Sequence, residues 1–382
     1  MSEPVFDVIV VGGGLVGASL ALALSRQGRA VALVEPRPPE TDGLEAGWDT
    51  RIYAVSPQNR DFLAGLGAWP DARRIGRVAS MDVRGDRDGR LSFSAAEIGQ
   101  VELAAIAENR WMLAALWRAI RASGITVVEG RAQRFDTDPR AARLTMDGGA
   151  VLSASLLAGA DGANSWLRRE AGIAASVRPY GQSGVVANFA CALPHGDCAR
   201  QWFLGDGVLA WLPLPGNYFS MVWSTSDSER LLALDAATLA ETVARAGGGA
   251  LGALTAITPA AAFPLRLIRP DSVIGQRLAL LGDAAHTVHP LAGQGVNLGF
   301  QDAARLAELI GRQGDPGEWA LLRRYERSRK EAVLTMQMTC DGLFRLFHQT
   351  APGLAHLRNT GLSLVNHLGP LKRQLARFAV GF

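Results

Sequence analysis

Lysine and cysteine are both scarce in this sequence. Lys330 and Lys372 are the only lysines, so nearly all the positive charge is arginine, and no Lys/Arg-rich block with interleaved aromatics occurs. These features argue against nucleic-acid binding. The three cysteines, Cys191, Cys198 and Cys340, have neither metal-ligand spacing nor the pattern of a disulfide framework. We therefore predict a reduced cytoplasmic setting and no metal site.

Long apolar runs are also missing. No uninterrupted apolar stretch reaches the roughly 18–20 residues that a spanning helix needs. The Met-Ser-Glu-Pro start lacks the basic region and cleavage site of a signal peptide. Hydrophobic residues make up 48% and charged residues 20% of the 382 positions, which is typical of a globular chain of about two domains. We expect a cytoplasmic protein, soluble or at most peripheral at the inner membrane surface.

A dinucleotide-binding unit is predicted at the start of the chain. Phe6 to Val11 is a short β-branched run, typical of a strand buried on both faces, and Gly12 to Gly17 reads G-x-G-x-x-G. An apolar helical stretch follows, and a second strand from Ala30 to Val34 ends in Glu35. A lone glycine motif is equally consistent with a structural turn, but these pieces together predict dinucleotide binding. The terminal acid suits ribose hydroxyls and favours FAD or NAD over NADP.

Each position of the glycine motif has a separate physical role in such a unit. Gly12 permits a tight turn, and Gly14 lets a pyrophosphate approach the backbone amides at the helix start, which includes Leu15 and Val16. Gly17 lets the helix pack closely on the strand. The motif therefore predicts both the turn and the direction from which a phosphate enters.

Three other polar residues stand where a ligand would be expected. Arg51 lies between a loop and an apolar segment, where it would face a phosphate or flavin edge, or form a surface salt bridge. Arg110 begins a predicted helix from Asn109 to Ser123 and, taken alone, is more typical of a solvated charge. Asp161 follows a strand and a glycine turn. We expect it to cap the next helix, a role that does not exclude contact with a ligand.

The stretch from Ala279 to Ala303 repeats the order of strand, glycine turn and helix. A short apolar strand breaks at Gly282, presents the carboxylate of Asp283 and leads through a loop to a helix that begins after Gln294. This arrangement offers one acceptor and several free backbone N–H groups to a bound ligand.

A mainly antiparallel sheet is predicted between Gly184 and Thr225, where turns at 205–207 and 215–217 join three strands as a meander. Its side chains would either line a pocket or pack as ordinary core. The pocket candidates are Trp202, Leu212, Pro213 and Trp223. The tail from Ala355 to Phe382 would pack across the protein's own surface or lie on membrane lipid.

Several motifs together resemble a known family. Three nucleotide-site segments resemble those of the class A flavoprotein aromatic hydroxylases: Gly12 to Gly17, Ala160-Asp161-Gly162 and Gly282-Asp283. The ubiquinone-biosynthesis hydroxylases within that class have a signature similar to the run from His289 to Gly299 followed by Asp302. Further segments similar to that family are Asp49-Thr50-Arg51, Glu108-Asn109-Arg110 and Tyr325-Glu326-Arg327. The resemblance extends from about Phe6 to Arg329 and is vaguest in the inserted sheet and the tail.

The resemblance implies a tight, non-covalent FAD site. Asp283 would bind the ribityl chain, and the backbone N–H groups of 293–297 would stabilise negative charge on the reduced flavin. Arg51 and Arg110 would lie near the pyrophosphate, ribityl chain or flavin, and Asp161 would serve FAD and the nicotinamide. The cofactor-binding residues so implied are Gly12, Gly14, Leu15, Val16, Gly17, Glu35, Arg51, Arg110, Asp161, Asp283, Pro290, Gly293, Gln294, Gly295, Val296 and Asn297.

The implied domain organisation is an α/β fold with a Rossmann-like FAD-binding domain, an inserted antiparallel substrate domain and C-terminal helices. The FAD-binding domain would comprise residues 1–78, 104–178 and 273–340. The substrate domain would comprise 79–103 and 179–272, and the C-terminal helical region 341–382.

The implied chemistry belongs to the cofactor: reduced FAD adds O2 at C4a, and the distal oxygen passes to an electron-rich ring carbon. NAD(P)H would be a transient reductant, since there is no second nicotinamide-binding motif. No catalytic base is assigned. The candidates are His286, His289 and the adjacent Pro290, and either histidine would relay a phenol proton or serve as a structural hydrogen-bonding group.

We therefore predict an FAD-dependent monooxygenase that hydroxylates a polyprenyl phenol or benzoquinol intermediate of ubiquinone biosynthesis. Alternatives are hydroxylation of another aromatic compound, a catalytically silent FAD-binding subunit of a biosynthetic complex, and a two-electron flavin dehydrogenase. A homo-oligomer, or association with a membrane or a biosynthetic complex, is compatible with this sequence.

Overall fold

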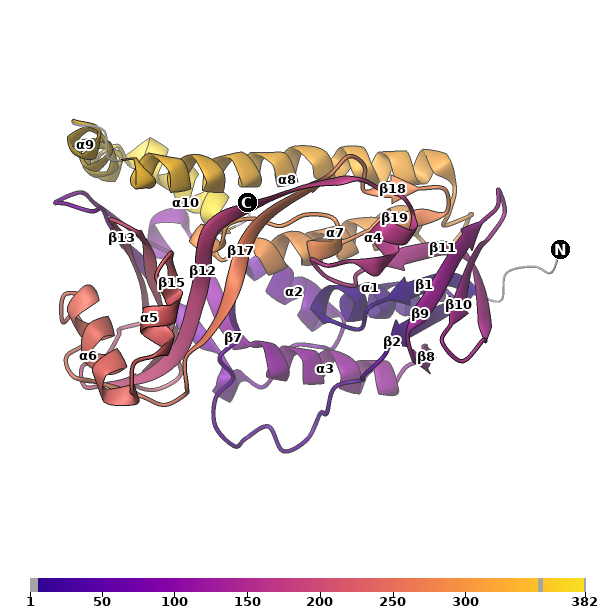
Figure 1. The fold of residues 1–382 in the computed structure, drawn as a ribbon, viewed down its shortest axis with the longest axis horizontal. Helices are drawn as coiled ribbons and strands as arrows, with labels where there is room; N and C mark the ends of the chain where they lie inside the picture. Colours follow the sequence, from indigo (N-terminus) through magenta and orange to yellow (C-terminus); the bar gives the residue numbers. More distant parts are fainter. Residues whose placement is uncertain (1–5, 350–352, 381–382) are drawn as a thin grey trace.

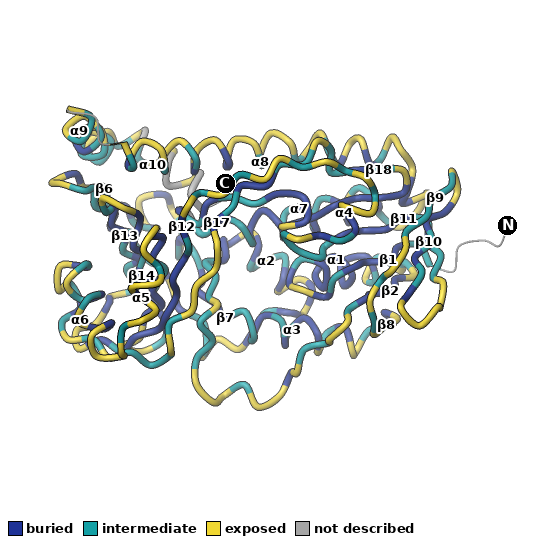
Figure 2. The backbone as a smooth tube through the Cα atoms, in the orientation of Figure 1, coloured by how far each residue is buried: buried dark blue, intermediate teal, exposed yellow. Residues whose placement is uncertain are grey.

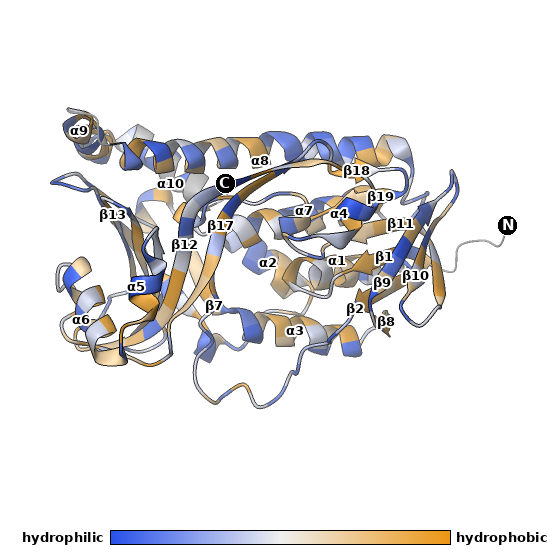
Figure 3. Ribbon diagram, in the orientation of Figure 1, coloured by the Kyte–Doolittle hydropathy of each residue, from blue (hydrophilic) through white to orange (hydrophobic). Residues whose placement is uncertain are grey.

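Strand β1 (Phe6–Val11) lies inside the first sheet of the computed structural model, which describes residues 6–349 and 353–380. Val8, Ile9 and Val10 are fully buried, because both faces of this apolar strand are covered (Figure 3). The spatial order of the strands is β8 (Thr126–Glu129), β2 (Val31–Glu35), β1, β11 (Val151–Gly159), β19 (Leu278–Leu280) and β18 (Ile274–Gly275). Each neighbouring pair from β8 to β19 is parallel, and the edge strand β18 is antiparallel to β19.

Different layers cover the two faces of this sheet. One face carries α1 (Leu15–Arg26), α3 (Asn109–Arg121) and α7 (Gly295–Ile310), whose apolar residues share a core with β1 and β2. The other face packs against the meander of β9 (Ala132–Thr137) and β10 (Ala142–Met146) and the short helix α4 (Trp166–Glu170). The arrangement is Rossmann-like, as predicted from the strand–glycine–helix pattern.

A second, mainly antiparallel sheet forms the other lobe (Figure 1). The meander predicted from the turns at 205–207 and 215–217 is confirmed as β13–β14–β15, and β5 and β6 form a further antiparallel hairpin. Helices α5 (Ser228–Leu232) and α6 (Ala236–Ala246) follow the meander in the chain. The strands are β5 (Ser80–Arg84), β6 (Arg90–Ser94), β12 (Ala175–Cys191), β13 (Cys198–Leu204), β14 (Gly207–Leu214), β15 (Tyr218–Thr225), β16 (Leu254–Ala256) and β17 (Ala261–Pro270).

Two kinds of connection join the lobes. The long ribbon of β12 and β17 runs from the second sheet towards the first, and α8 (Trp319–His348) spans both lobes along one side (Figure 1). A small sheet of β3 (Ile52–Val55), β7 (Ala104–Glu108) and β4 (Gly76–Val78), with α2 (Pro57–Gly65), lies between them. The cofactor loops predicted from sequence occur along this junction.

The C-terminal part of the chain is helical. Helix α8 is followed by α9 (Leu354–His367) and α10 (Gly369–Val380), and one side of α8 is exposed (Figure 2). The predicted boundary at 340/341 falls inside α8, because no proline interrupts this helix between 319 and 348. Among residues 6–349 and 353–380, no helix is long and apolar enough to cross a membrane.

Candidate active site

Three of the four glycines in the segment from Gly12 to Gly17 are required by protein packing. A Cβ on Gly12, which has φ +103°, would lie 2.5 Å from the carbonyl oxygen of Ala160. On Gly13 it would lie 2.6 Å from the Trp117 ring, and on Gly17 it would overlap the carbonyl oxygen of Gly12. Gly14 differs, because a Cβ there meets no protein atom within 4 Å. Its open side therefore faces the space that a phosphate would enter.

Glu35 fixes the other edge of this turn. Its Oε2 accepts a hydrogen bond from Gly13 N at 2.8 Å, and its Oε1 accepts one from Arg37 N at 3.1 Å. Beside it a groove of about 400 Å³ is lined by residues that include Gly12, Glu35, Arg131 and Asp161. This groove joins the glycine turn to the second predicted segment and is suited to a nucleoside.

Asp161 organises the start of α4, although it is not the helix cap that we predicted. Its carboxylate accepts hydrogen bonds from Ser165 Oγ at 2.5 Å and Leu167 N at 3.0 Å. Ser165 is the N-cap, since its Oγ accepts from Arg168 N at 2.9 Å. Arg168 is buried and donates to the carbonyl of Ala284 at 2.7 Å. The second segment is thereby tied to the third.

Asp283 lies in the 3₁₀ turn Gly282–Ala284 directly after β19. Gly282 has φ +55°, a left-handed conformation that glycine adopts without strain. The Asp283 side chain is exposed, yet nearby protein desolvates it and raises its pKa, although His286 and Arg51 act in the opposite direction. An accessible carboxylate set so deeply in the protein suits a polar ligand entering a cleft.

Helix α7 presents its N-terminus beside this carboxylate. Gly293, at φ +60°, leads into the helix through the N-cap residue Gln294. Gly299 lets α7 approach α1, because a Cβ there would lie 2.5 Å from Val16 Cγ2. The free N–H groups and positive dipole ends of two helices are therefore close together.

The Asn297 side chain is used to bind protein. Its Oδ1 accepts hydrogen bonds from Ser56 N at 2.9 Å and Asn59 Nδ2 at 2.8 Å, and its Nδ2 donates to the Ala54 carbonyl at 2.8 Å. These bonds hold the start of α7 against β3 and α2. The first turn of α7, which includes Gly295 and Val296, thus offers backbone N–H groups to a cofactor.

The segments 49–51 and 108–110, both part of the family resemblance, meet through Asp49. Asp49 N donates to Glu108 Oε2 at 2.6 Å, and its carboxylate accepts from the backbone N–H groups of Arg51 (2.9 Å) and Arg110 (3.0 Å). The Arg110 guanidinium donates to the Gly47 carbonyl, so it holds a neighbouring loop. Arg51 is exposed and lies near enough to Asp283 to lower its pKa. Arg51 is therefore better placed than Arg110 to meet a phosphate.

A buried ionic cluster supports the Asp283 turn from behind. Asp302 accepts hydrogen bonds from His286 Nε2 and Arg329 Nε, each at 2.6 Å, and from Gly282 N at 3.0 Å. Burial opposes ionisation of Asp302, but His286 and Arg329 outweigh it and hold the pKa below its usual value. His286 is thus committed to this carboxylate, which favours a structural role over proton relay.

His289 lies in a different environment. Its ring packs edge-on against Tyr180, with centroids 4.8 Å apart, and near Phe344 at 5.0 Å. Neither ring nitrogen has a hydrogen-bond partner among the described residues. Burial, together with the charge of His348, lowers the pKa of His289 to about 4, against the opposing effect of Asp341. The ring is therefore neutral at pH 7.

This shift predicts acid-sensitive stability. Between pH 6.5 and 4 the unfolded chain protonates His289 while the folded protein does not, so stability falls by about 3 kcal/mol as the pH is lowered. Urea unfolding at several pH values should show this loss. The His289→Leu variant should lack this loss of stability between pH 6.5 and 4. The control variant His367→Leu, at an exposed histidine, should retain it. Identical slopes for His289→Leu and the unmodified protein would contradict the prediction.

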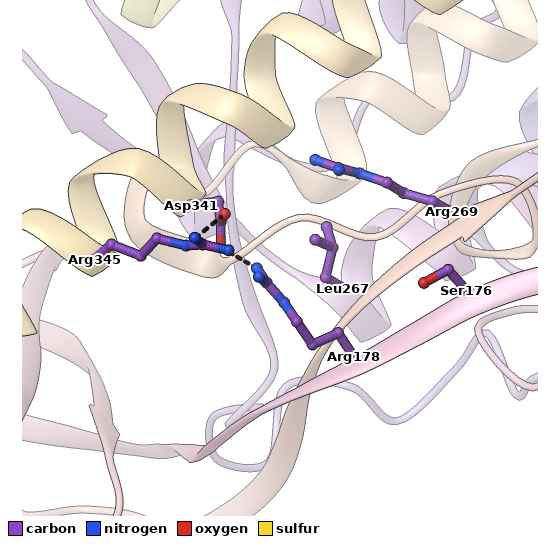
Figure 4. Close-up of a pocket in the computed structure, with 6 residues that line it drawn as sticks. All are labelled: Ser176, Arg178, Leu267, Arg269, Asp341 and Arg345. Carbon is purple, nitrogen blue, oxygen red and sulfur yellow. Dashed lines mark hydrogen bonds and ion pairs between the residues drawn. The ribbon is translucent and has the colours of Figure 1, made fainter.

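Helix α8 is also tied to the β12–β17 ribbon (Figure 4) and, through Gln337, to the loop that contains His289. Asp341 pairs with Arg178 on β12 and with Arg345 at 3.0 Å, beside a cavity of about 180 Å³. Arg269 in the same cavity donates to Gln337 Oε1 at 2.7 Å, and Gln337 Nε2 donates to the Thr287 carbonyl at 2.9 Å. Ionic and amide contacts thus connect α8, the long ribbon and the loop that contains His289.

The four predicted pocket candidates do not all lie on one face of the second sheet. Trp202 and Trp223 pack with Leu239 of α6, on the face away from the first lobe. Leu212 belongs instead to the opposite face, in a cluster with Ile106 of β7. Pro213 is buried, with its carbonyl against Gly76. Leu212 is therefore the pocket candidate on the side of the cofactor loops, and the two tryptophans are core residues.

This fold and its site are those of an FAD-dependent monooxygenase. The crystal structure of p-nitrophenol 4-monooxygenase PnpA from Pseudomonas putida DLL-E4 superimposes with a TM-score of 0.80 and 18% identity, covering 99% of each chain. The family model described as "FAD binding domain" matches residues 5–339. The 3-demethoxyubiquinol 3-hydroxylase of Escherichia coli is 35% identical over 391 residues, covering all of both chains. Ubiquinone hydroxylase UbiL of Rhodospirillum rubrum is 36% identical over 393 residues, covering 100% of this chain and 90% of that protein.

The chain therefore belongs to this FAD-binding family, together with the ubiquinone hydroxylases. The predictions of fold class, FAD as cofactor and monooxygenase type are confirmed. The residues present fit FAD: the open side of Gly14, the groove at Glu35, the accessible Asp283 and the N-terminus of α7 follow one another along the junction.

Proposed function

We propose that this protein hydroxylates the aromatic ring of a polyprenylated phenol or benzoquinol on the way to ubiquinone. Support comes from the residues along the junction that fit FAD and from relatives named as ubiquinone hydroxylases that match the chain over its whole length. The lobe with the parallel sheet would hold FAD, and the lobe with the antiparallel sheet would hold the substrate. NAD(P)H is proposed as the reductant.

Some residues would bind FAD, and others would exclude water from the substrate ring. FAD, when bound, supplies the reduced ring that activates O2. The N-terminus of α7 would stabilise negative charge beside that ring. The substrate ring would lie between Leu212 and the loop at Pro290 and Leu291. The latter already packs with Phe203 and Val208 of the second sheet, which keeps water out.

A catalytically silent FAD-binding subunit is the alternative, and no contact among residues 6–349 and 353–380 favours it. The turn at Asp283, the buried Asp302 cluster and the helix N-terminus are all in place. These residues would hold FAD in either case, so transfer of oxygen to a product separates the two functions.

The decisive experiment measures transfer of oxygen from labelled O2. The purified protein should show a flavin spectrum and, with NAD(P)H and a prenylated phenol, yield product containing one labelled oxygen. The Asp283→Ala variant is the matched control. Loss of a hydrogen bond to a charged group, about 1.5–3 kcal/mol, should weaken FAD binding about tenfold to a hundredfold. Bound FAD with unlabelled product would contradict the proposed function.

A further inference from the structure

Helix α9 packs on the protein through its polar side. Asn359 is buried, its Oδ1 accepts a hydrogen bond from Gly89 N at 3.1 Å, and its Nδ2 donates to Asp86 Oδ1 at 2.8 Å. Ser363 and Asn366 accept hydrogen bonds from backbone N–H groups of β6 at 3.4 and 3.1 Å. These residues bind the β5–β6 hairpin of the substrate lobe. The inward side of this helix is thus the polar one.

The outward side carries a row of leucines, which we name the outer stripe. Leu357, Leu364 and Leu368 are 69%, 57% and 43% exposed, and with the exposed Gly361 they repeat at helical spacing. Surface helices of globular proteins place their apolar stripe towards the core. This helix has the reverse orientation. Covering each leucine would contribute about 1 kcal/mol.

The chain segment that carries the outer stripe has charge of a single sign. From Gly342 to Phe382 the sequence contains no Asp or Glu, but five Arg or Lys. Arg358 and Lys372 pair with acids on the substrate lobe. Arg373 and Arg377 are exposed. A surface that is both apolar and basic is complementary to a bilayer containing anionic lipid.

A second copy of the chain fits this surface less well. A symmetric contact between two copies of this segment, which contains five Arg or Lys and no Asp or Glu, would bring like charges together. A stable dimer also buries roughly 800 Å² on each partner, whereas three partly exposed leucines form a single narrow row. A bilayer interface accepts such a row without a matching protein surface.

We infer that the outer stripe of α9 inserts into the surface of an anionic lipid bilayer. Inserted there, the stripe holds the substrate lobe at the membrane, because α9 is bonded directly to the β5–β6 hairpin of that lobe. The inference deepens the proposed function, since a polyprenylated ring resides in lipid. It does not depend on catalysis by the bound flavin.

The test is co-sedimentation of the full-length FAD-loaded protein with vesicles of phosphatidylcholine, with and without phosphatidylglycerol. The protein should bind the mixed vesicles and bind pure phosphatidylcholine more weakly. The triple variant Leu357→Ser, Leu364→Ser, Leu368→Ser should lose at least about tenfold in affinity. The matched control carries Val101→Ser, Val151→Ser and Leu193→Ser, three exposed apolar residues elsewhere, and should bind normally. Flavin absorbance and thermal midpoint verify that each variant is folded.

Three outcomes would overturn the inference. They are absence of binding by the unmodified protein, equal binding by the outer-stripe triple variant, and a dimer in light scattering that this variant converts to monomer. A soluble short-chain phenol separates this test from that of the proposed function. If that phenol is hydroxylated without any vesicle binding, the docking inference is wrong and the function stands. Vesicle binding without hydroxylation would contradict the proposed function alone.

Discussion

The Gly17→Ala variant is expected to lose FAD binding because it fails to build the β1–α1 turn. Its Cβ would overlap the Gly12 carbonyl oxygen. Gly12 has little room to move away, because a Cβ position on its other side is already 2.5 Å from the Ala160 carbonyl oxygen. Strain of this kind in a packed core should cost about 3 kcal/mol or more. Urea unfolding and flavin content of the purified protein measure the two effects.

Gly14→Ala is the matched control, and its expected effect has a different character. No protein atom lies within 4 Å of the new Cβ, and Gly14 has φ −68°. The stability of the FAD-free protein should therefore change by less than about 1 kcal/mol. FAD affinity should still fall at least about tenfold, because the methyl group occupies the approach of the phosphate. A Gly14→Ala protein that binds FAD normally would show that the pyrophosphate lies elsewhere, and a stable, FAD-loaded Gly17→Ala protein would refute the packing argument.

The cofactor turns could be predicted because their causes are local in the sequence. The strand, the glycines and the terminal Glu35 lie within thirty positions of one another, and each is constrained by neighbours in the same unit. The loop from Gly282 to Asn297 was predictable for the same reason. The sequence did not predict which face of the second sheet is covered by helices. Alternation along β13 places Trp202 and Phe203 on opposite faces of the second sheet. Only the position of α6 determines which of the two packs in the cluster beneath that helix.

Long-range polar contacts also could not be predicted from the sequence. Asn359 binds a glycine 270 positions earlier, and no local pattern indicates that the polar side of α9 is the inward one. Asp302 was part of the family resemblance without an assigned role. Its contact with His286 requires α7 and the loop after β19 to be side by side. Trp117 likewise donates from Nε1 to the Gly13 carbonyl at 2.8 Å, a support of the glycine turn that α3 supplies from 104 positions away.

The Asp302→Ala variant is expected to lose about 3–5 kcal/mol of stability, the range for removing one partner of a buried ion pair. Asp302 is 1% exposed, and its removal leaves Arg329 and His286 without their shared carboxylate. The Gly282 N–H also loses its acceptor, so the turn that presents Asp283 is freed and FAD affinity should fall. Urea unfolding and FAD titration measure these losses. The control is Asp227→Ala, whose pair with Arg230 is exposed and should contribute less than about 1 kcal/mol.

The pH dependence distinguishes loss of the Asp302 charge from loss of packing. The pKa of Asp302 is lowered in the folded protein, so its ionisation stabilises the fold above the unfolded pKa of about 3.9 and ceases to do so as the pH falls through the folded value. The stability difference between the unmodified protein and Asp302→Ala should therefore narrow below about pH 4. A loss of packing alone would give the same stability difference at every pH. If the difference is the same at pH 7 and in acid, Asp302 stabilises the site by shape alone, and the ionic cluster behind the Asp283 turn is not its source of rigidity.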